Sequence, residues 1–174
     1  FASKHISKEK RPSFTVHAIG NWNKADFGGQ ERKLCFSHAG LLKTLFIELN
    51  KNWSILKEKK LENFEVTTEA THHGPYLNKP AVFIEIGSTE KEWKASLNGK
   101  LIAVTIINAI KAYEKEPRTY KSAIILGGGH YNQAANKLLL STDYAVAHIC
   151  PKYALIDLDE VTLTEAINKI IPKP

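Results

Sequence analysis

Hydrophobic residues follow two periodicities that alternate along the whole chain, and this alternation restricts the fold more than any other feature. Segments such as Phe64–Ala70 and Ala81–Gly87 alternate in period two or form short apolar runs, which is typical of strands. They are interspersed with segments such as Gly40–Leu56, whose apolar residues recur every three to four positions, as on one face of a helix. No repeat, low-complexity tract or linker rich in Pro, Gly or Ser interrupts this order. We therefore predict one α/β domain over residues 1–174.

The same patterns give approximate bounds for the elements. We predict strands over Ser13–Ile19, Lys33–Ser37, Phe64–Ala70, Ala81–Gly87, Ser122–Leu126 and Asp143–Cys150. Thr89 with Glu92, and Thr162 with Glu165, have the spacing of a capping box, which predicts a helix start at each pair. Gly99 is expected to kink or split the first of these two helices.

The composition limits the class of protein and of partner. Hydrophobic residues make up 43% and charged residues 24% of the 174 residues, and no apolar run approaches the ~20 residues that a bilayer crossing needs. We expect a globular protein without a membrane partner. The net charge of +6 favours a polyanionic partner, and nucleic acid is one candidate.

The first residues and the cysteines indicate a compartment. Position 1 is Phe1 and no methionine occurs, so we expect a segment to precede the sequence shown. The opening residues contain no apolar stretch that ends in small residues, so a secretory signal is not indicated and we expect a cytoplasmic location. Cys35 and Cys150 lie far apart without CxxC spacing, which argues against a disulfide framework and a thiolate zinc site. We predict that both are buried.

Three histidines follow strands and lie in glycine-containing turns: His72 and His73 in EATHHGP, and His130 in GGGHY. Neutral imidazole is both a zinc ligand and a general base near pH 7, so these turns suit metal-assisted hydrolysis as well as acid–base catalysis. No HExxH, HxH or CxxC motif is present, so a metal site would need ligands from remote segments. Because adjacent side chains of an extended chain point in opposite directions, we expect one of His72 and His73 to face a cleft.

Two glutamates lie at strand positions where a carboxylate needs a partner. Glu69 ends a strand directly before the histidine pair, and Glu85 is flanked by apolar residues in AVFIEIG. Each is either a metal ligand, an orienting partner of a histidine Nδ1–H, or an outward-facing strand residue. His17 is a further candidate ligand, His5 stays open, and His38 and His148 are interpreted as structural.

The glycine run Gly127–Gly129 lies between a buried strand and a helix. Such a loop admits positive φ and offers N–H groups to a phosphate or an oxyanion, although a tight turn also needs glycine for steric reasons alone. Neither GxxxxGK[ST] nor GxGxxG occurs, which argues against nucleoside triphosphate chemistry. No GxSxG motif occurs and neither cysteine lies in a catalytic motif, so activated water is the predicted nucleophile.

These motifs occur together and in a fixed order: SKH, PSFTVH, GNW with FGG, EATHHGP, VFIEIGS, GGGHY and HICPKYAL. In this the chain resembles the D-aminoacyl-tRNA deacylases of the archaeal and plant type over nearly its whole length. The resemblance implies hydrolysis of the ester between a D-amino acid and tRNA, dependence on Zn²⁺, and tRNA as the partner. We expect a monomer. The resemblance also implies a three-layer sandwich with a mixed, largely parallel sheet, similar to nucleoside phosphorylases and peptidyl-tRNA hydrolases. One departure is NQAANK after GGGHY, where the family has an Ala-Pro-basic run.

The resemblance and the residue chemistry together give a candidate site. The predicted catalytic residues are His72, His73, His130 and Glu69, and the predicted metal ligands are His17, His73, His130 and Glu85. The predicted substrate-binding residues are Gly127, Gly128, Gly129 and Tyr131. The predicted phosphate contacts are Lys51, Lys57, Lys59, Lys60, Lys111, Lys115, Arg118 and Lys121, of which the first four otherwise form a solvated helix end. The alternatives are a metal- or histidine-dependent hydrolase or phosphorylase of a nucleoside or small amide, and a non-catalytic tRNA-binding module.

Overall fold

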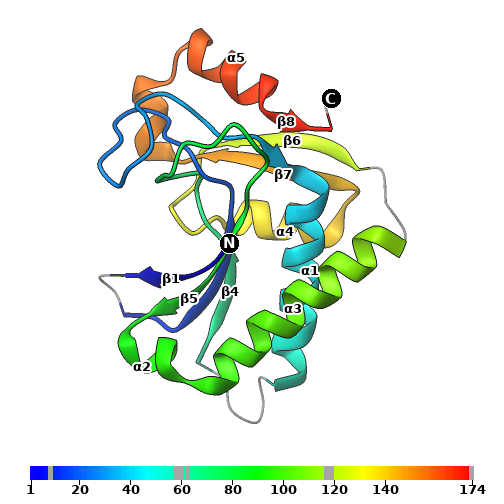
Figure 1. Cartoon of the computed structure of the whole chain (residues 1–174). Coiled ribbons are helices and arrows are strands. Elements are labelled where there is room, and N and C mark those ends of the chain that lie inside the picture. Colours follow the sequence, from blue (N-terminus) through cyan, green and yellow to red (C-terminus); the bar gives the residue numbers. More distant parts are fainter. Residues whose placement is uncertain (8–9, 57–60, 62, 116–119, 173–174) are drawn as a thin grey trace.

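The largest sheet is mixed and has the strand order β1-β5-β2-β4 (Figure 1). The computed structural model describes residues 1–7, 10–56, 61, 63–115 and 120–172. The strands of this sheet are β1 (Ala2–Ile6), β5 (Phe83–Ser88), β2 (Ser13–His17) and β4 (Glu65–Thr68). β1 runs parallel to β5 and β2 parallel to β4, whereas β2 and β5 are antiparallel.

Two further pairs of strands are both parallel. They are β6 (Lys121–Leu126) with β7 (Tyr144–Cys150), and β3 (Ser37–His38) with β8 (Ile170–Ile171). Helix α4 (Gln133–Ser141) connects β6 to β7, as the strand–glycine loop–helix pattern predicts. Among the described residues the only antiparallel strand pair is β2–β5, so the predicted mixed, largely parallel α/β architecture is confirmed. The finer three-layer, phosphorylase-like arrangement stays a prediction.

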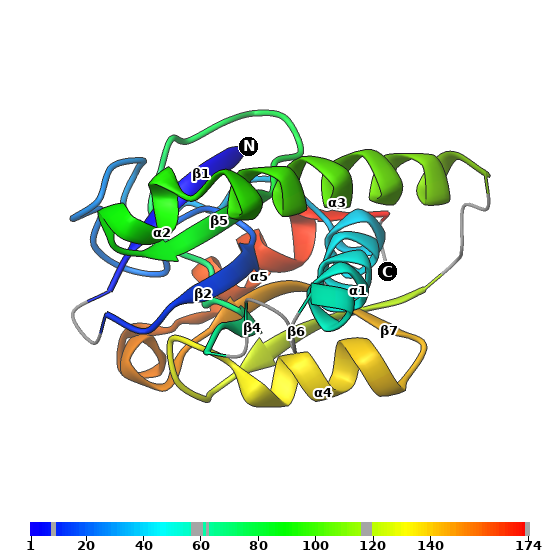
Figure 2. The ribbon, with the colours of Figure 1, turned by 90° about the horizontal axis from the view of Figure 1, so that it is seen from below.

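Helix α1 (Ala39–Leu56) packs against both the four-stranded sheet and the β6–β7 pair and joins them into one core. Its predicted apolar stripe is confirmed, because Leu42, Leu45, Phe46 and Leu49 are buried in one cluster with residues of β2, β5, β7 and α3 (Ser96–Lys115). Figure 2 shows α1 between α3 and α4. Burial of each such side chain stabilises the fold by about 1.5–3 kcal/mol relative to exposure.

The predictions about two helix starts and one helix break are only partly confirmed. The Thr89–Glu92 capping box is confirmed, but it begins the short α2 (Glu90–Lys94), and the break before α3 lies at the extended residue Ala95 rather than at Gly99. The prediction that Thr162 and Glu165 begin a helix as a capping box is wrong. Helix α5 (Glu160–Asn168) begins earlier, because Asp159 accepts a hydrogen bond from the backbone N–H of Thr162 at 2.9 Å.

The predicted strand Lys33–Ser37 is also largely wrong. Leu34 makes an isolated bridge to Gly20, and regular pairing begins only at Ser37. Strand β1 was not predicted, since its five residues ASKHI carry no clear periodicity.

Both cysteines are buried and free, as predicted. Within the described part of the chain, every helix is too short or too polar to cross a bilayer. Lys57, Lys59, Lys60 and Arg118 lie outside the described residues.

Candidate active site

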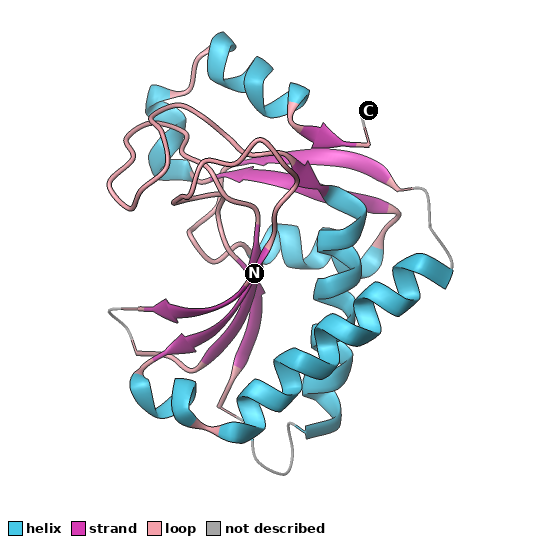
Figure 3. Ribbon diagram, viewed as in Figure 1, coloured by secondary structure: helices cyan, strands magenta, loops and turns pink. Residues whose placement is uncertain are grey.

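The two histidine turns meet because the chain that follows β4 runs between the ends of β2 and β7. Beyond β4, His72 forms a parallel bridge with Ile19, and the N–H of Thr71 donates to the carbonyl of Ile149 at 2.9 Å. The second turn lies against the first, since the N–H of Ala70 donates to the carbonyl of His130 at 2.7 Å. The long loops gather at this end of the large sheet, facing β6 and β7 (Figure 3). The ring centroids of His72 and His130 are 4.5 Å apart, which confirms the predicted convergence.

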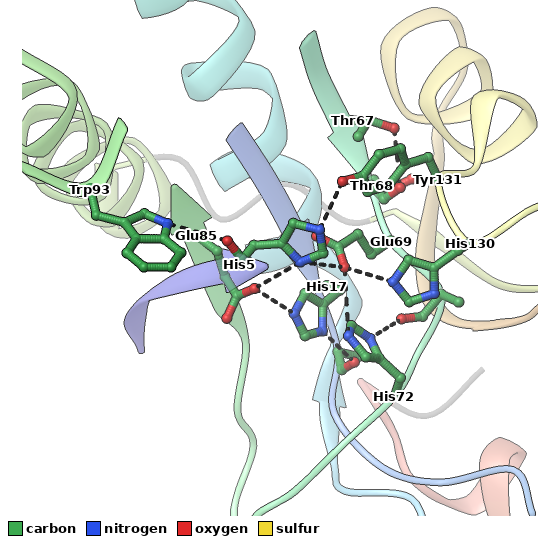
Figure 4. Close-up of polar contacts among 12 residues, drawn as sticks. His5, His17, Thr67, Thr68, Glu69, His72, Glu85, Trp93, His130 and Tyr131 are labelled. Carbon is green, nitrogen blue, oxygen red and sulfur yellow. Dashed lines mark hydrogen bonds and ion pairs between the residues drawn. The ribbon is translucent and has the colours of Figure 1, made fainter. Parts of the chain in front are cut away.

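Glu69 lies at the centre of this cluster and is 1% exposed (Figure 4). Its Oε2 atom lies 2.9 Å from Nε2 of His130, 3.4 Å from Nδ1 of His5 and 3.5 Å from Nε2 of His72. Burial raises the pKa of this carboxyl group, but the hydrogen bond from His130 and the charges of the surrounding histidines outweigh burial and hold the pKa well below its usual range. Glu69 is therefore ionised at physiological pH.

Glu85 is the second buried carboxylate, and His5 lies between it and Glu69. Its Oε2 atom lies 3.8 Å from Nδ1 of His5 and 3.7 Å from Nε2 of His17. The other nitrogen of His5, Nε2, lies 2.8 Å from the hydroxyl oxygen of Tyr131. Sequence reasoning missed His5 as a site residue. The only signal was its place in the SKH motif, since the pairing of β1 with β5 is what brings it to Glu85.

Three histidines present one nitrogen each to a common point. Nδ1 of His17, His72 and His73 lies 3.0, 2.8 and 2.6 Å from the backbone carbonyl oxygens of Ala18, Ala70 and Gly74. A carbonyl oxygen only accepts, so each Nδ1 carries a proton, and in the neutral form of each ring the lone pair lies on Nε2. One ring nitrogen of each histidine lies within 4.8 Å of those of the other two. This is a donor set of the kind that binds zinc, with the second ring nitrogens already oriented.

The electrostatic surroundings of these three rings differ. Burial and the charge of His17 lower the pKa of His73, and burial lowers the pKa of His72 to about 2. At His17 burial also acts against the charged form, but the carboxylates of Glu85 and Glu69 outweigh it and raise the pKa. His17 Nε2 is buried without a hydrogen-bond partner among the described residues, which leaves it available as a ligand atom.

The backbone at His73 explains why both adjacent rings reach the site. His73 has a φ of 49°, in the left-handed region, so the pair is not extended and the expectation that the two side chains point in opposite directions is wrong. Their ring centroids are 4.5 Å apart. The next residue must be glycine, because a Cβ atom on Gly74 would lie 2.3 Å from the backbone nitrogen of Gly29. The turn therefore packs directly on the loop that carries Phe27.

His130 links the buried carboxylate to an exposed phenol. Its Nε2 donates to the Glu69 carboxylate, so Nδ1 carries the lone pair and accepts from the hydroxyl of Tyr153 at 3.0 Å. Tyr153 belongs to the 3₁₀ helix η2 (Lys152–Asp157) and is 61% exposed. Burial of the hydroxyl and the charge of Glu69 raise the pKa of Tyr153, which keeps it protonated. Nδ1 of His130 is thus a base that faces the surface.

Two cavities meet at these histidines, and we call them the large lobe and the small lobe. Both are lined by His72, His73, His130 and Phe27. The large lobe has a volume of about 590 Å³ and is further lined by Ser3, Lys4, His5, Ile6, Phe83 and Glu85. The small lobe has a volume of about 330 Å³, and its other walls are Asn21, Trp22, Asn23, Lys24, Asp26, Thr71, Pro151, Tyr153 and Ala154. These volumes are typical of small-molecule sites.

The structure brings the four predicted catalytic residues together, whereas the four predicted metal ligands do not form one group of donors. In the part of the chain that the structure describes, His17 and His73 group with His72, whereas His130 and Glu85 belong to other groups of donors. The reason is the orientation of the rings, which follows from the local carbonyl contacts and not from sequence spacing.

The glycine run serves the site by positioning His130. Gly127 and Gly128 have the expected positive φ, of 115° and 81°. The start of α4 is capped by Asn132, whose side chain accepts from the N–H of Ala135 at 3.0 Å. The two lobes are lined neither by Gly127–Gly129 nor by Tyr131, so a substrate-binding role for these residues stays a prediction.

The two histidines interpreted as structural lie outside the two lobes. His38 contacts the Tyr113 hydroxyl at 2.9 Å. His148 is fully buried, and burial lowers its pKa to about 3.

The fold and the site define an α/β protein with a buried histidine–carboxylate centre at the loop ends of its strands. The sequence model of the D-aminoacyl-tRNA deacylase family matches residues 1–173, so the chain belongs to this family. It is 43% identical to a D-aminoacyl-tRNA deacylase of Pyrococcus horikoshii over 88% of the chain and 54% of that protein. It is 40% identical to one of Thermococcus kodakarensis over 97% of the chain and 59% of that protein.

A solved structure has the same fold. The crystal structure of a conserved protein of unknown function superimposes with a TM-score of 0.89 and 36% sequence identity, over 98% of this chain and 58% of that one. The chain thus spans little more than half the length of these relatives.

Proposed function

We propose that this chain hydrolyses the ester that joins a D-amino acid to the 3′ end of tRNA, releasing the free D-amino acid and tRNA. Family membership supports the reaction class, since its relatives are named D-aminoacyl-tRNA deacylases. The observation that carries the proposal is the Glu69–His130 pair, in which the unprotonated Nδ1 of His130 faces a cavity beside three converging histidines. We place the protein in the cytoplasm as a monomer, with the three-layer fold of the phosphorylases and peptidyl-tRNA hydrolases.

Zinc fits the three-histidine group. His17, His72 and His73 supply three ring nitrogens as ligands, and their other nitrogens donate to backbone carbonyls, as zinc ligands commonly do. When bound there, zinc supplies a Lewis acid and lowers the pKa of a coordinated water. Glu69, at 3.5 Å from His72, adds a negative charge beside this group.

His130 acts as the general base and then as the general acid. Its Nδ1 takes a proton as the oxygen of water attacks the ester carbonyl carbon, and it returns that proton to the 3′ oxygen as the carbon–oxygen bond breaks. Glu69 fixes the ring in the tautomer with a free Nδ1 and stabilises the imidazolium that forms. The hydroxyl of Tyr153 marks the direction from which an O–H group reaches Nδ1.

The net charge of +6 supports tRNA as the partner. Of the predicted phosphate contacts, the described ones are Lys51, Lys111, Lys115 and Lys121. Because phosphate contacts release counterions, tRNA affinity is expected to fall steeply as salt rises. An affinity that does not change with ionic strength would contradict a role for these lysines.

The deciding experiment incubates the protein with D-tyrosyl-tRNA and L-tyrosyl-tRNA in parallel, with and without a chelator. We expect release from the D substrate only, and loss of activity with the chelator. Equal release from both substrates, or none, would refute the proposal. Turnover of nucleosides with inorganic phosphate would identify a phosphorylase, and tRNA binding without cleavage would identify a binding module.

A further inference from the structure

We propose that the two lobes divide the substrate at the ester: the large lobe holds the amino acid, with Glu85 facing its α-ammonium group, and the small lobe holds the terminal nucleoside, with its base stacked on Tyr153. This assignment rests on the proposed function. It names the subsites that the reaction would use on either side of the scissile bond.

The large lobe has the chemistry of an amino-acid subsite. Glu85 lies in its wall, and the nearby nitrogens of His5 and His17 are 3.8 and 3.7 Å from the carboxylate, beyond hydrogen-bond distance. The carboxylate therefore keeps acceptor capacity for a cation. The remaining walls include the apolar side chains of Phe83 and Ile6, which suit an amino-acid side chain. Lys4 also lines this lobe, and its Nζ lies 4.9 Å from the ring centre of Trp93.

The small lobe has the chemistry of a nucleotide subsite. Tyr153 is 61% exposed, so a face of its ring is available for stacking, and every nucleobase can stack on an aromatic ring. Lys24, an exposed cation of the same lobe, suits the phosphate that precedes the terminal nucleoside. The small lobe also contains the carboxylate of Asp26, so its charges are mixed, whereas in the reverse orientation the phosphate would face the buried Glu85, which is a repulsive contact.

The position of His130 gives an independent argument for this orientation. Nδ1 of His130, the atom that would return a proton to the leaving 3′ oxygen, points to Tyr153 in the small lobe. The leaving oxygen belongs to the ribose, so the ribose must lie on the Tyr153 side. The amino acid then lies on the side of Glu85, with the ester carbonyl beside the histidines that line both lobes.

The assignment can be tested by measuring variants of each lobe with two substrates that differ only in the amino acid. Tyr153→Ala is expected to raise KM about 5- to 150-fold, equally for D-tyrosyl-tRNA and D-alanyl-tRNA, because both carry the same terminal base. Tyr153→Phe keeps the ring, so it should keep the wild-type KM for both substrates. Ile6→Ala is expected to raise KM several-fold for D-tyrosyl-tRNA and to leave D-alanyl-tRNA unchanged, since Ile6 is 73% exposed and its truncation opens no core cavity. Ile156→Ala is the matched control, because Ile156 lies on the same 3₁₀ helix as Tyr153, is 87% exposed and lines neither lobe.

Binding of substrate fragments tests the assignment without turnover. By calorimetry, adenosine 5′-monophosphate should lose affinity at least fivefold in Tyr153→Ala and keep it in Glu85→Gln, whereas D-tyrosinamide should show the opposite pattern. The reversed pattern, or absence of binding of either fragment to the wild-type protein, would overturn the assignment of the lobes. A wild-type protein that binds both fragments with the expected pattern but cleaves no D-aminoacyl-tRNA would instead refute the proposed function.

Discussion

Replacing Glu69 by glutamine tests whether a buried carboxylate sets the state of the catalytic base. The change keeps the shape of the side chain and removes its charge. Oε1 of Glu69 has no hydrogen-bond partner among the described residues, whereas nitrogens of three histidines lie within 3.5 Å of Oε2. A buried N–H group without an acceptor costs about 1–3 kcal/mol, so the amide NH₂ of the glutamine will occupy the Oε2 position.

At that position the amide donates to Nε2 of His130, which moves the ring proton to Nδ1. The base then has no lone pair toward the small lobe. Since general base catalysis and the correct histidine tautomer contribute about 10²- to 10⁴-fold, kcat should fall by that factor, equal to about 3–5 kcal/mol of activation free energy.

The assay is single-turnover deacylation of D-tyrosyl-tRNA, together with zinc content and thermal melting of the same preparation. Glu65→Gln is the matched control, because Glu65 begins β4, the strand that ends directly before Glu69, and its Oε1 accepts a hydrogen bond from Gln133 at 2.7 Å, away from both lobes. We expect the Glu69 variant to keep its zinc and the control to keep its activity. Wild-type kcat in the Glu69 variant would refute the role of the carboxylate, and loss of zinc would show that Glu69 is a metal ligand instead.

Three further predictions follow from the same geometry. His72→Ala should lose bound zinc, measured by elemental analysis of the purified protein, because it removes one of three converging nitrogens; full zinc content would contradict the three-histidine site. Burial holds the folded-state pKa of His148 near 3, below the unfolded value of about 6.5, so only the unfolded state binds this proton at pH 5. The stability that depends on a neutral His148 is therefore complete above about pH 6.5 and is lost as the pH falls toward 3. Urea unfolding should give a free energy of unfolding about 2 kcal/mol lower at pH 5 than at pH 8, and His148→Phe should reduce this difference. An equal difference in both proteins would contradict the prediction. Gly74→Ala should lower the free energy of unfolding by about 1–3 kcal/mol and raise KM, because its Cβ atom would displace the Gly29 loop; an unchanged melting temperature and KM would contradict the packing described.

The sequence contains enough information for the class of fold and for the meeting of the two turns. Glycine-rich turns after strands, each with a histidine, predict a shared loop end, and the structure places His72 and His130 there. The membership of the three-histidine group could not be predicted from the sequence. It depends on the left-handed φ at His73 and on the carbonyl contacts that orient each ring, and the spacing of residues in the sequence predicts neither of these.

His5 was missed for a related reason. Its strand β1 is short and polar, and it becomes a strand only through pairing with β5, which lies about eighty residues further along the chain. Propensity describes local preference, so an edge strand of this kind is invisible to it. The cap of α5 shows a similar limit, since Asp159 and Thr162 are both good cap residues and tertiary packing decides between them.

Each of the three converging rings is anchored to a carbonyl no more than two positions away in the chain: Ala18, Ala70 and Gly74. The orientation of the three rings is therefore set by two short stretches of backbone and does not depend on the other side chains that line the lobes. Side chains that line the large lobe, such as Ile6 and Phe27, can then be exchanged without changing the orientation of the three rings. Substrate range and chemistry are separately adjustable in this scaffold.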